Sequence, residues 1–96
     1  MPSYEEHCRQ SQQAFGKRFE EVHRWLDEFA DTVEYGMKHR RKRHHAEGIR
    51  QAVERFGKEA EAVARLHVVE DLKLEGWTES DSFPKNETDY VAMGLF

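Results

Sequence analysis

The stretch that decides the fold class is FGKRFEEVHRWLDEFADTV, residues 15–33. Its apolar residues recur at spacings of four and three, which places them on one stripe of a helix. The members of this stripe are Phe15, Phe19, Val22, Leu26, Phe29 and Val33. The pattern predicts a helix over about residues 15–34, and Gly36 is a suitable stop just after it.

Working outward from this stretch, the chain predicts further helices and almost no β pattern. Ser3 followed by Glu6 is a capping-box pattern, which predicts a short helix over about 4–14. Two further helices are expected over about 37–56 and 59–75, the second apolar on two sides as in a helix packed between neighbours. Asn86 is placed to cap a last short helix in the tail, residues 77–96. We therefore expect an all-α fold: a small bundle of three long helices, a short N-terminal helix and an ordered C-terminal tail, in one domain over 1–96.

Length and composition narrow the class of protein. With 96 residues, 38% of them hydrophobic and 35% charged, the chain can bury one modest core. Cys8 is the single cysteine, so an intrachain disulfide and a cysteine-built zinc site are excluded. No signal peptide and no apolar run long enough to cross a membrane is found. These features predict a cytoplasmic protein that does not engage a membrane.

A basic stretch, KHRRKRHH at residues 38–45, lies at the centre of the chain. Such a density of cations can neutralise phosphates, so the candidates for nucleic-acid or acidic-partner contact are Lys38, Arg40, Arg41, Lys42 and Arg43. The chain as a whole, however, carries a net charge of −4. We favour the alternative that the stretch is solvated or paired within the protein with the acidic residues of 20–31.

Histidines and an aspartate suggest a metal site. His67 and Asp71 lie one helical turn apart, a spacing at which two side chains can bind one divalent transition metal. His45 is expected on the inward face of the helix over 37–56, with His44 pointing away from the core, and His23 flanks the aromatic stripe. The predicted ligands are therefore His45, His67, Asp71 and His23. The alternative, which we favour, is a buried His67–Asp71 hydrogen-bonded pair that needs no metal.

Enzymatic chemistry finds little support in the sequence. A metal-dependent hydrolase of the HD type is also helical, but it needs adjacent His and Asp residues. Here His44 is followed by His45, and His67 by Val68. Cys8 follows His7 directly, and neighbours in a helix do not face each other. We therefore expect no catalytic residues.

Several segments together are similar to a known family. They are YEEHC at 4–8, EVHRWLD at 21–27, RHHAEGI at 43–49 and ARLH at 64–67. The combination resembles a family of small bacterial all-helical proteins of unknown function with a His- and Arg-rich central helix. The resemblance implies a helical domain and brings no activity with it.

The sequence thus favours a non-catalytic binding or interaction module, with the aromatic stripe and separated charges compatible with a homodimer. The alternatives are a His/Asp metal-binding protein, including a metal-dependent hydrolase, and a nucleic-acid-associated accessory protein.

Overall fold

The computed structural model describes residues 4–32 and 36–95. Five α-helices and two 3-10 segments follow one another, and no strand occurs in these ranges, so the all-α prediction is confirmed. The helices are α1 (Tyr4–Phe15), α2 (Glu20–Leu26), α3 (Ala46–Phe56), α4 (Ala60–Leu74) and α5 (Glu87–Ala92). The 3-10 segments are η1 (Glu28–Asp31) and η2 (Gly36–Lys42). Ser3, the expected cap of α1, lies outside the described ranges.

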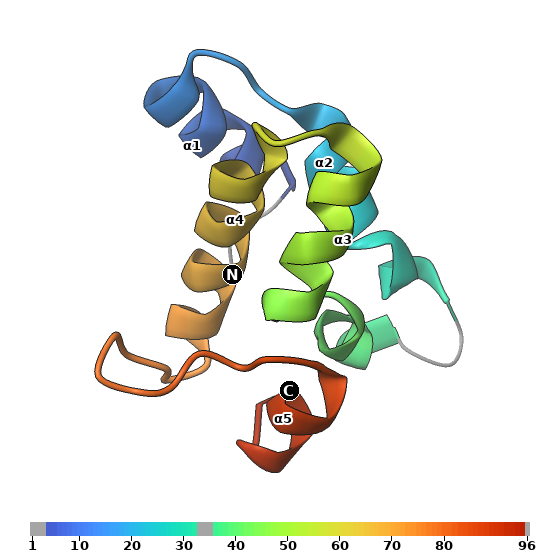
Figure 1. Cartoon of the computed structure of the whole chain (residues 1–96), viewed down its shortest axis with the longest axis vertical. Coiled ribbons are helices and arrows are strands. Elements are labelled where there is room, and N and C mark those ends of the chain that lie inside the picture. The colour runs from blue at the N-terminus through green and yellow to red at the C-terminus, as the bar shows by residue number, and fades with distance from the viewer. Residues whose placement is uncertain (1–3, 33–35, 96) are drawn as a thin grey trace.

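Helix α4 is the centre of the arrangement. It packs against α1, α2 and α3, and α3 and α4 form an antiparallel hairpin (Figure 1). Its buried residues face these neighbours and include Val63, Ala64, Val68 and Leu72. The sandwiched position explains why α4 is apolar on more than one side.

The helix predicted over 15–34 is wrong in its extent. The backbone of Gly16 has a φ of 82° and that of Phe19 a φ of 53°, so the chain turns between α1 and α2 instead of continuing as a helix. Helix α2 then ends at Leu26, and η1 follows after Asp27. Two members of the predicted stripe, Val22 and Leu26, nevertheless face the core.

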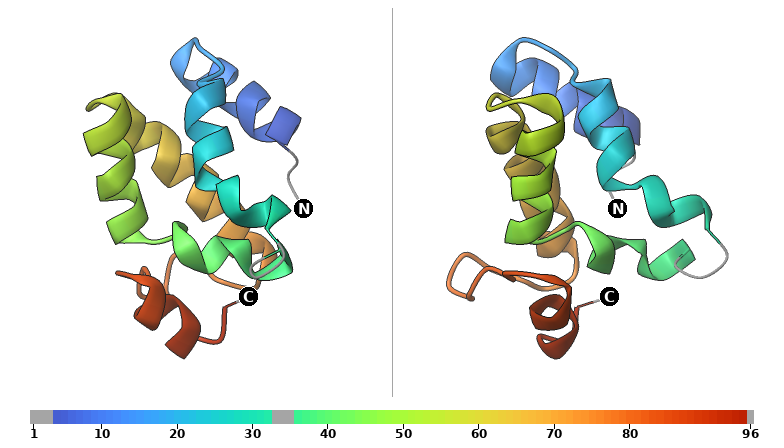
Figure 2. Two further views of the ribbon diagram at one scale, coloured as in Figure 1. Left: turned by 90° about the vertical axis from the view of Figure 1, so that its right-hand side faces the viewer. Right: turned by 45° about the vertical axis from the view of Figure 1, so that its right-hand side comes forward.

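The helix predicted over 37–56 is also divided. Its first part is η2, which lies beside η1 (Figure 2). Arg43, His44 and His45 then link η2 to α3. His45 is the N-cap of α3: its backbone is extended, and its Nδ1 accepts a hydrogen bond of 3.0 Å from the amide of Gly48. A Cβ at Gly48 would lie 1.9 Å from the carbonyl oxygen of Arg43, so only glycine permits this close approach.

The tail packs across one end of the bundle. Asn86 caps α5 by accepting from the amide of Asp89 at 2.9 Å, as predicted. The segment before α5 passes beneath α3 and α4 (Figures 1 and 2). There the carbonyls of Pro84 and Lys85 accept hydrogen bonds of 2.9 Å from the amides of Ala46 and Glu47, the first residues of α3. The tail thereby satisfies amides that the helix itself leaves without partners.

Candidate metal centre

Six polar side chains lie together in the interior, between α1, α2, α4 and the segment that precedes α3. We call them the buried cluster. Helices α1, α2 and α4 and the two links at Asp27 and before α3 each contribute to it. Its members are His7, His23, Asp27, His44, His67 and Asp71. All except Asp27 are at most 2% exposed.

Asp71 is the hub of the buried cluster. Its Oδ2 accepts a hydrogen bond of 2.9 Å from Nε2 of His44, and Nε2 of His7 lies 3.2 Å from its Oδ1. A guanidinium nitrogen of Arg40 lies 3.4 Å from the same Oδ1. This carboxylate is 3% exposed, so nearly all of its charge is balanced by protein groups and not by water.

His67 faces two carboxylates on one side and a histidine on the other. Its Nε2 lies 3.3 Å from Oδ2 of Asp27 and 3.4 Å from Oδ2 of Asp71. That nitrogen is nevertheless buried without a well-formed hydrogen bond. Its Nδ1 lies 2.8 Å from Nδ1 of His23. An orphaned buried nitrogen between two carboxylates is an arrangement that a cation would satisfy.

Four of the six side chains have the spacing of metal ligands. We call Asp27, His44, His67 and Asp71 the four-donor group; their ligand atoms all lie within 4.8 Å of one another. A tetrahedral ion with ligands at about 2.0–2.2 Å keeps those ligands about 3.3–3.6 Å apart. Nε2 of His67 lies within this range of Oδ2 of Asp27 and Oδ2 of Asp71, and Nε2 of His44 lies 3.5 Å from the other oxygen of Asp27. The fourth distance, 2.9 Å between His44 Nε2 and Asp71 Oδ2, is that of a hydrogen bond and would have to lengthen around an ion. The ring planes of His44 and His67 are inclined at 69°, so these two rings are not stacked on each other.

A second possible group shares His67. We call His7, His23 and His67 the three-histidine group; it satisfies the same distance criterion. Its rings are nearly parallel, with His7 stacked on His67 at 3.7 Å and 15°. The nitrogen lone pairs of parallel, stacked rings lie in parallel planes, so those of His7 and His67 do not meet at one point. The four-donor group is therefore the better metal site, and it also supplies negative charge.

Both carboxylates of the four-donor group are held in the ionised form. Burial raises the pKa of Asp71, but the hydrogen bond from His44 and the close contact with His67 outweigh it and hold that pKa well below its usual range. The pKa of Asp27 is lowered in the same way, since the hydrogen bond from His39 and the close contact with His67 outweigh its burial. The centre therefore presents two negative charges at neutral pH.

The histidines differ in their protonation. Burial lowers the pKa of His44 to about 4, and burial together with the charge of His67 lowers the pKa of His23 to about 3. Burial also acts to lower the pKa of His67, but its close contacts with the carboxylates of Asp27 and Asp71 outweigh this effect and raise it. His44 and His23 are thus neutral at pH 7, as a metal ligand and its supporting group must be.

A second layer of polar groups supports Asp71. Arg40 is 6% exposed and donates to Oε2 of Glu75 at 3.2 Å. The hydroxyl of Tyr90, from α5, donates to the same oxygen at 2.9 Å. Glu75 thereby fixes the guanidinium that faces Asp71, and the C-terminal helix contributes to this support.

The predicted ligands are only partly brought together. His23, His67 and Asp71 lie in the buried cluster, whereas His45 caps α3 and its Nε2 faces the carbonyl of Arg41 at 3.1 Å. The prediction that His44 points away from the core is wrong, since His44 is fully buried against Asp71.

Sequence reasoning also missed His7 and Asp27. His7 could not be found from spacing, because it lies far along the chain from the other members; His7 and Asp71, for example, are 64 residues apart. Asp27 follows His23 by four residues, the same spacing as His67 and Asp71, and this repeated spacing was an available signal.

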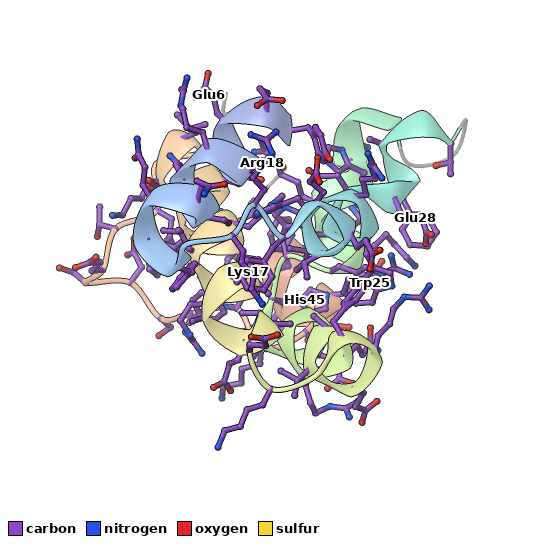
Figure 3. All side chains as sticks on the ribbon, turned by 90° about the horizontal axis from the view of Figure 1, so that it is seen from above. Glu6, Lys17, Arg18, Trp25, Glu28 and His45 are labelled. Atoms are coloured by element: carbon purple, nitrogen blue, oxygen red, sulfur yellow. The ribbon has the colours of Figure 1, made fainter. Side chains whose placement is uncertain are left out.

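The basic stretch is largely engaged within the protein. Arg43 forms an ion pair with Glu28 at 2.9 Å, and its guanidinium lies 3.9 Å from the centre of the Trp25 ring. Glu28 and Trp25 lie on the same side of the molecule (Figure 3). Lys42 pairs with Glu87 at 3.3 Å, and Arg40 is buried as described. Arg41 is half-buried and Lys38 is exposed. Contact with nucleic acid stays a prediction. Few of these cations are exposed where a nucleic acid could reach them.

An open groove adjoins the four-donor group. Its volume is about 760 Å³, and its lining includes His23, Asp27, Trp25, Arg55 and Phe56. The carboxylate of Asp27 is 28% exposed, while the other three side chains of the group are at most 3% exposed. The four-donor group is therefore open to solvent at Asp27, and an ion would enter from the groove past this side chain.

The fold and the buried cluster together define a small all-helical protein with a histidine and carboxylate centre in its core. The chain belongs to a family described as a domain of unknown function (DUF6915), whose model matches residues 1–82. No curated protein and no solved structure is a significant match. Among the described residues, no helix is long and apolar enough to cross a membrane.

Proposed function

We propose that this protein binds one divalent transition-metal ion through the four-donor group, and that it does so without catalysing a reaction. The observation that carries the proposal is His67 Nε2, a buried nitrogen that lies 3.3 and 3.4 Å from two ionised carboxylates without a well-formed hydrogen bond to either. Two imidazoles with two carboxylates suit zinc, iron, nickel or manganese. Since all four ligands come from the protein and three are buried, the arrangement matches a holding site more closely than a catalytic site with an open position.

Metal titration of chelator-treated protein tests the proposal. Isothermal calorimetry with Zn²⁺ should give one ion per chain, and His67→Ala should abolish this binding. His45→Asn is the matched control, because Asn is a good N-cap and His45 lies outside the buried cluster. Loss of zinc in His45→Asn, or no zinc uptake by the wild type, would contradict the proposal.

A metal-dependent hydrolase is the second candidate, and the groove beside Asp27 is the observation that favours it. If Asp27 yields its place to water, the ion can activate that water for attack on an ester. The test is turnover of an activated phosphodiester by zinc- or manganese-loaded protein. Hydrolysis that disappears in Asp71→Asn supports this candidate, and its absence in the loaded wild type removes it.

Homodimerisation and a cytoplasmic location also stay proposals. The exposed apolar side chains Phe15, Leu74 and Val91 lie on three different helices, so they offer no continuous stripe for a partner. Light scattering over a range of concentrations measures the mass directly. The buried, unpaired thiol of Cys8 is compatible with a reducing compartment.

A further inference from the structure

We infer that Ser11 and His23 act as positioning residues that set the tautomer of His67 and thereby its affinity for the metal. This inference rests on the proposed metal site and deepens it. Ser11 and His23 are buried, and neither belongs to the four-donor group.

The three residues form a relay of two successive contacts. Oγ of Ser11 lies 2.7 Å from Nε2 of His23, and Nδ1 of His23 lies 2.8 Å from Nδ1 of His67. A single proton occupies each contact when both rings are neutral, because two lone pairs or two N–H groups at that distance would repel each other. The protonation of one ring nitrogen therefore dictates the others.

When both rings are neutral, two proton arrangements are compatible with these contacts. In the first, the Ser11 hydroxyl donates to His23, His23 Nδ1–H donates to His67 Nδ1, and His67 carries its proton on Nε2, facing the carboxylates. In the second, His67 Nδ1–H donates to His23 Nδ1, His23 Nε2–H donates to Ser11, and the lone pair of His67 Nε2 is free. Both arrangements contain the same number of protons.

Only the second arrangement can bind a metal through Nε2 of His67. A hydroxyl at residue 11 permits both, since it can donate or accept. Metal-bound imidazoles are typically held by a partner at the other nitrogen, and loss of that partner weakens binding about 10- to 100-fold. His44 offers a contrast, because its Nδ1 is buried with no hydrogen-bond partner. The relay thus makes His67 the pre-oriented ligand.

Two substitutions of nearly equal size separate positioning from packing. His23→Asn keeps an acceptor oxygen close to the position of Nδ1, whereas His23→Leu removes it. We expect zinc binding to fall about 10- to 100-fold in His23→Leu and to recover most of this loss in His23→Asn. Ser11→Ala should also weaken binding, and His45→Asn should not. A purely structural role for His23 would instead lower the melting temperature of both zinc-free variants without separating their zinc affinities.

The side-chain ¹⁵N resonances of the histidines provide the direct readout. In the zinc-loaded wild type, His67 should be protonated at Nδ1 and bound through Nε2. Equal zinc affinity in His23→Leu and wild type, or a His67 Nδ1 without a proton in the loaded state, would overturn the inference while leaving the metal site intact. Equal loss in the Leu and Asn variants would also overturn it, by indicating zinc at the three-histidine group. Failure of the wild type to bind zinc at all would be a failure of the proposed function itself.

Discussion

Replacing Asp71 with Asn tests the electrostatic balance of the buried cluster. The substitution keeps the size of the side chain and removes the negative charge that faces Arg40, His44 and His7. Breaking a buried ion pair by removing one partner costs about 3–5 kcal/mol. The Asn carbonyl still accepts one hydrogen bond, which returns about 1 kcal/mol. We therefore expect metal-free Asp71→Asn to lose about 2–4 kcal/mol of unfolding free energy.

A loss of this size is large for a chain of 96 residues. Stabilities of about 0.05–0.15 kcal/mol per residue give a total of about 5–14 kcal/mol. The melting temperature should fall by roughly 10–30 °C. Urea unfolding followed by circular dichroism, with a chelator present, measures the difference. Asp81→Asn is the control, because Asp81 is exposed and accepts only from the adjacent turn at Thr78, so a change within about 0.5 kcal/mol is expected.

The pH dependence gives the prediction a second arm. Because the folded pKa of Asp71 is depressed, its stabilisation is fully present above the unfolded pKa of about 3.9 and is lost only as the pH falls below it. Asp71 itself therefore contributes equally at pH 7 and pH 5, whereas the stability that comes from the raised pKa of His67 is fully present only below about pH 6.5, so the gap between wild type and Asp71→Asn should be at least as large at pH 5 as at pH 7. A gap below about 1 kcal/mol at pH 7 would refute the reasoning, since the carboxylate would then not be balancing the buried guanidinium of Arg40.

Three further outcomes are expected. His39 donates to Asp27, and this contact raises the pKa of His39 in the folded protein. Its contribution to stability is therefore present below about pH 6.5 and is lost as the pH rises through the folded-state pKa. The loss of unfolding free energy in His39→Asn, measured by urea unfolding, should be larger at pH 5.5 than at pH 8.5. Gly48→Ala should lower the free energy of unfolding by about 1–3 kcal/mol or prevent folding, because the added Cβ would clash with the carbonyl of Arg43. Gly36→Ala is the control and should melt close to the wild type, because a Cβ there would have no atom within 4 Å. Zinc at about 100 times its dissociation constant should stabilise the wild type by about 2.7 kcal/mol in a thermal melt, and no shift would count against the metal site.

Part of this structure could be read from the sequence because local signals determine it. Helix α4 matches its predicted range closely, since its apolar pattern and Gly76 are sufficient to define it. Helix α5 was found through Asn86, a cap whose hydrogen bond depends on neighbours within three residues.

The division of the two central helices could not be read in the same way. Periodicity does not report the left-handed backbone of Phe19, and the stripe continues across it. Likewise, a continuous helix over 37–56 places His44 on the outside, whereas the cap at His45 redirects the chain and buries it. The buried cluster depends on these irregular links, so its membership follows from the tertiary fold.

The docking of the tail has a consequence for the synthesis of this protein. All six members of the buried cluster precede Pro84 and Lys85, whose carbonyls satisfy the first amides of α3 directly after His44 and His45. A ribosome therefore synthesises all six of these residues before it synthesises residues 84–85. Until residues 84–85 have left the exit tunnel, the amides of Ala46 and Glu47 lack the carbonyls that accept from them in the folded protein. The first turn of α3 is thus completed only after every member of the buried cluster has been synthesised.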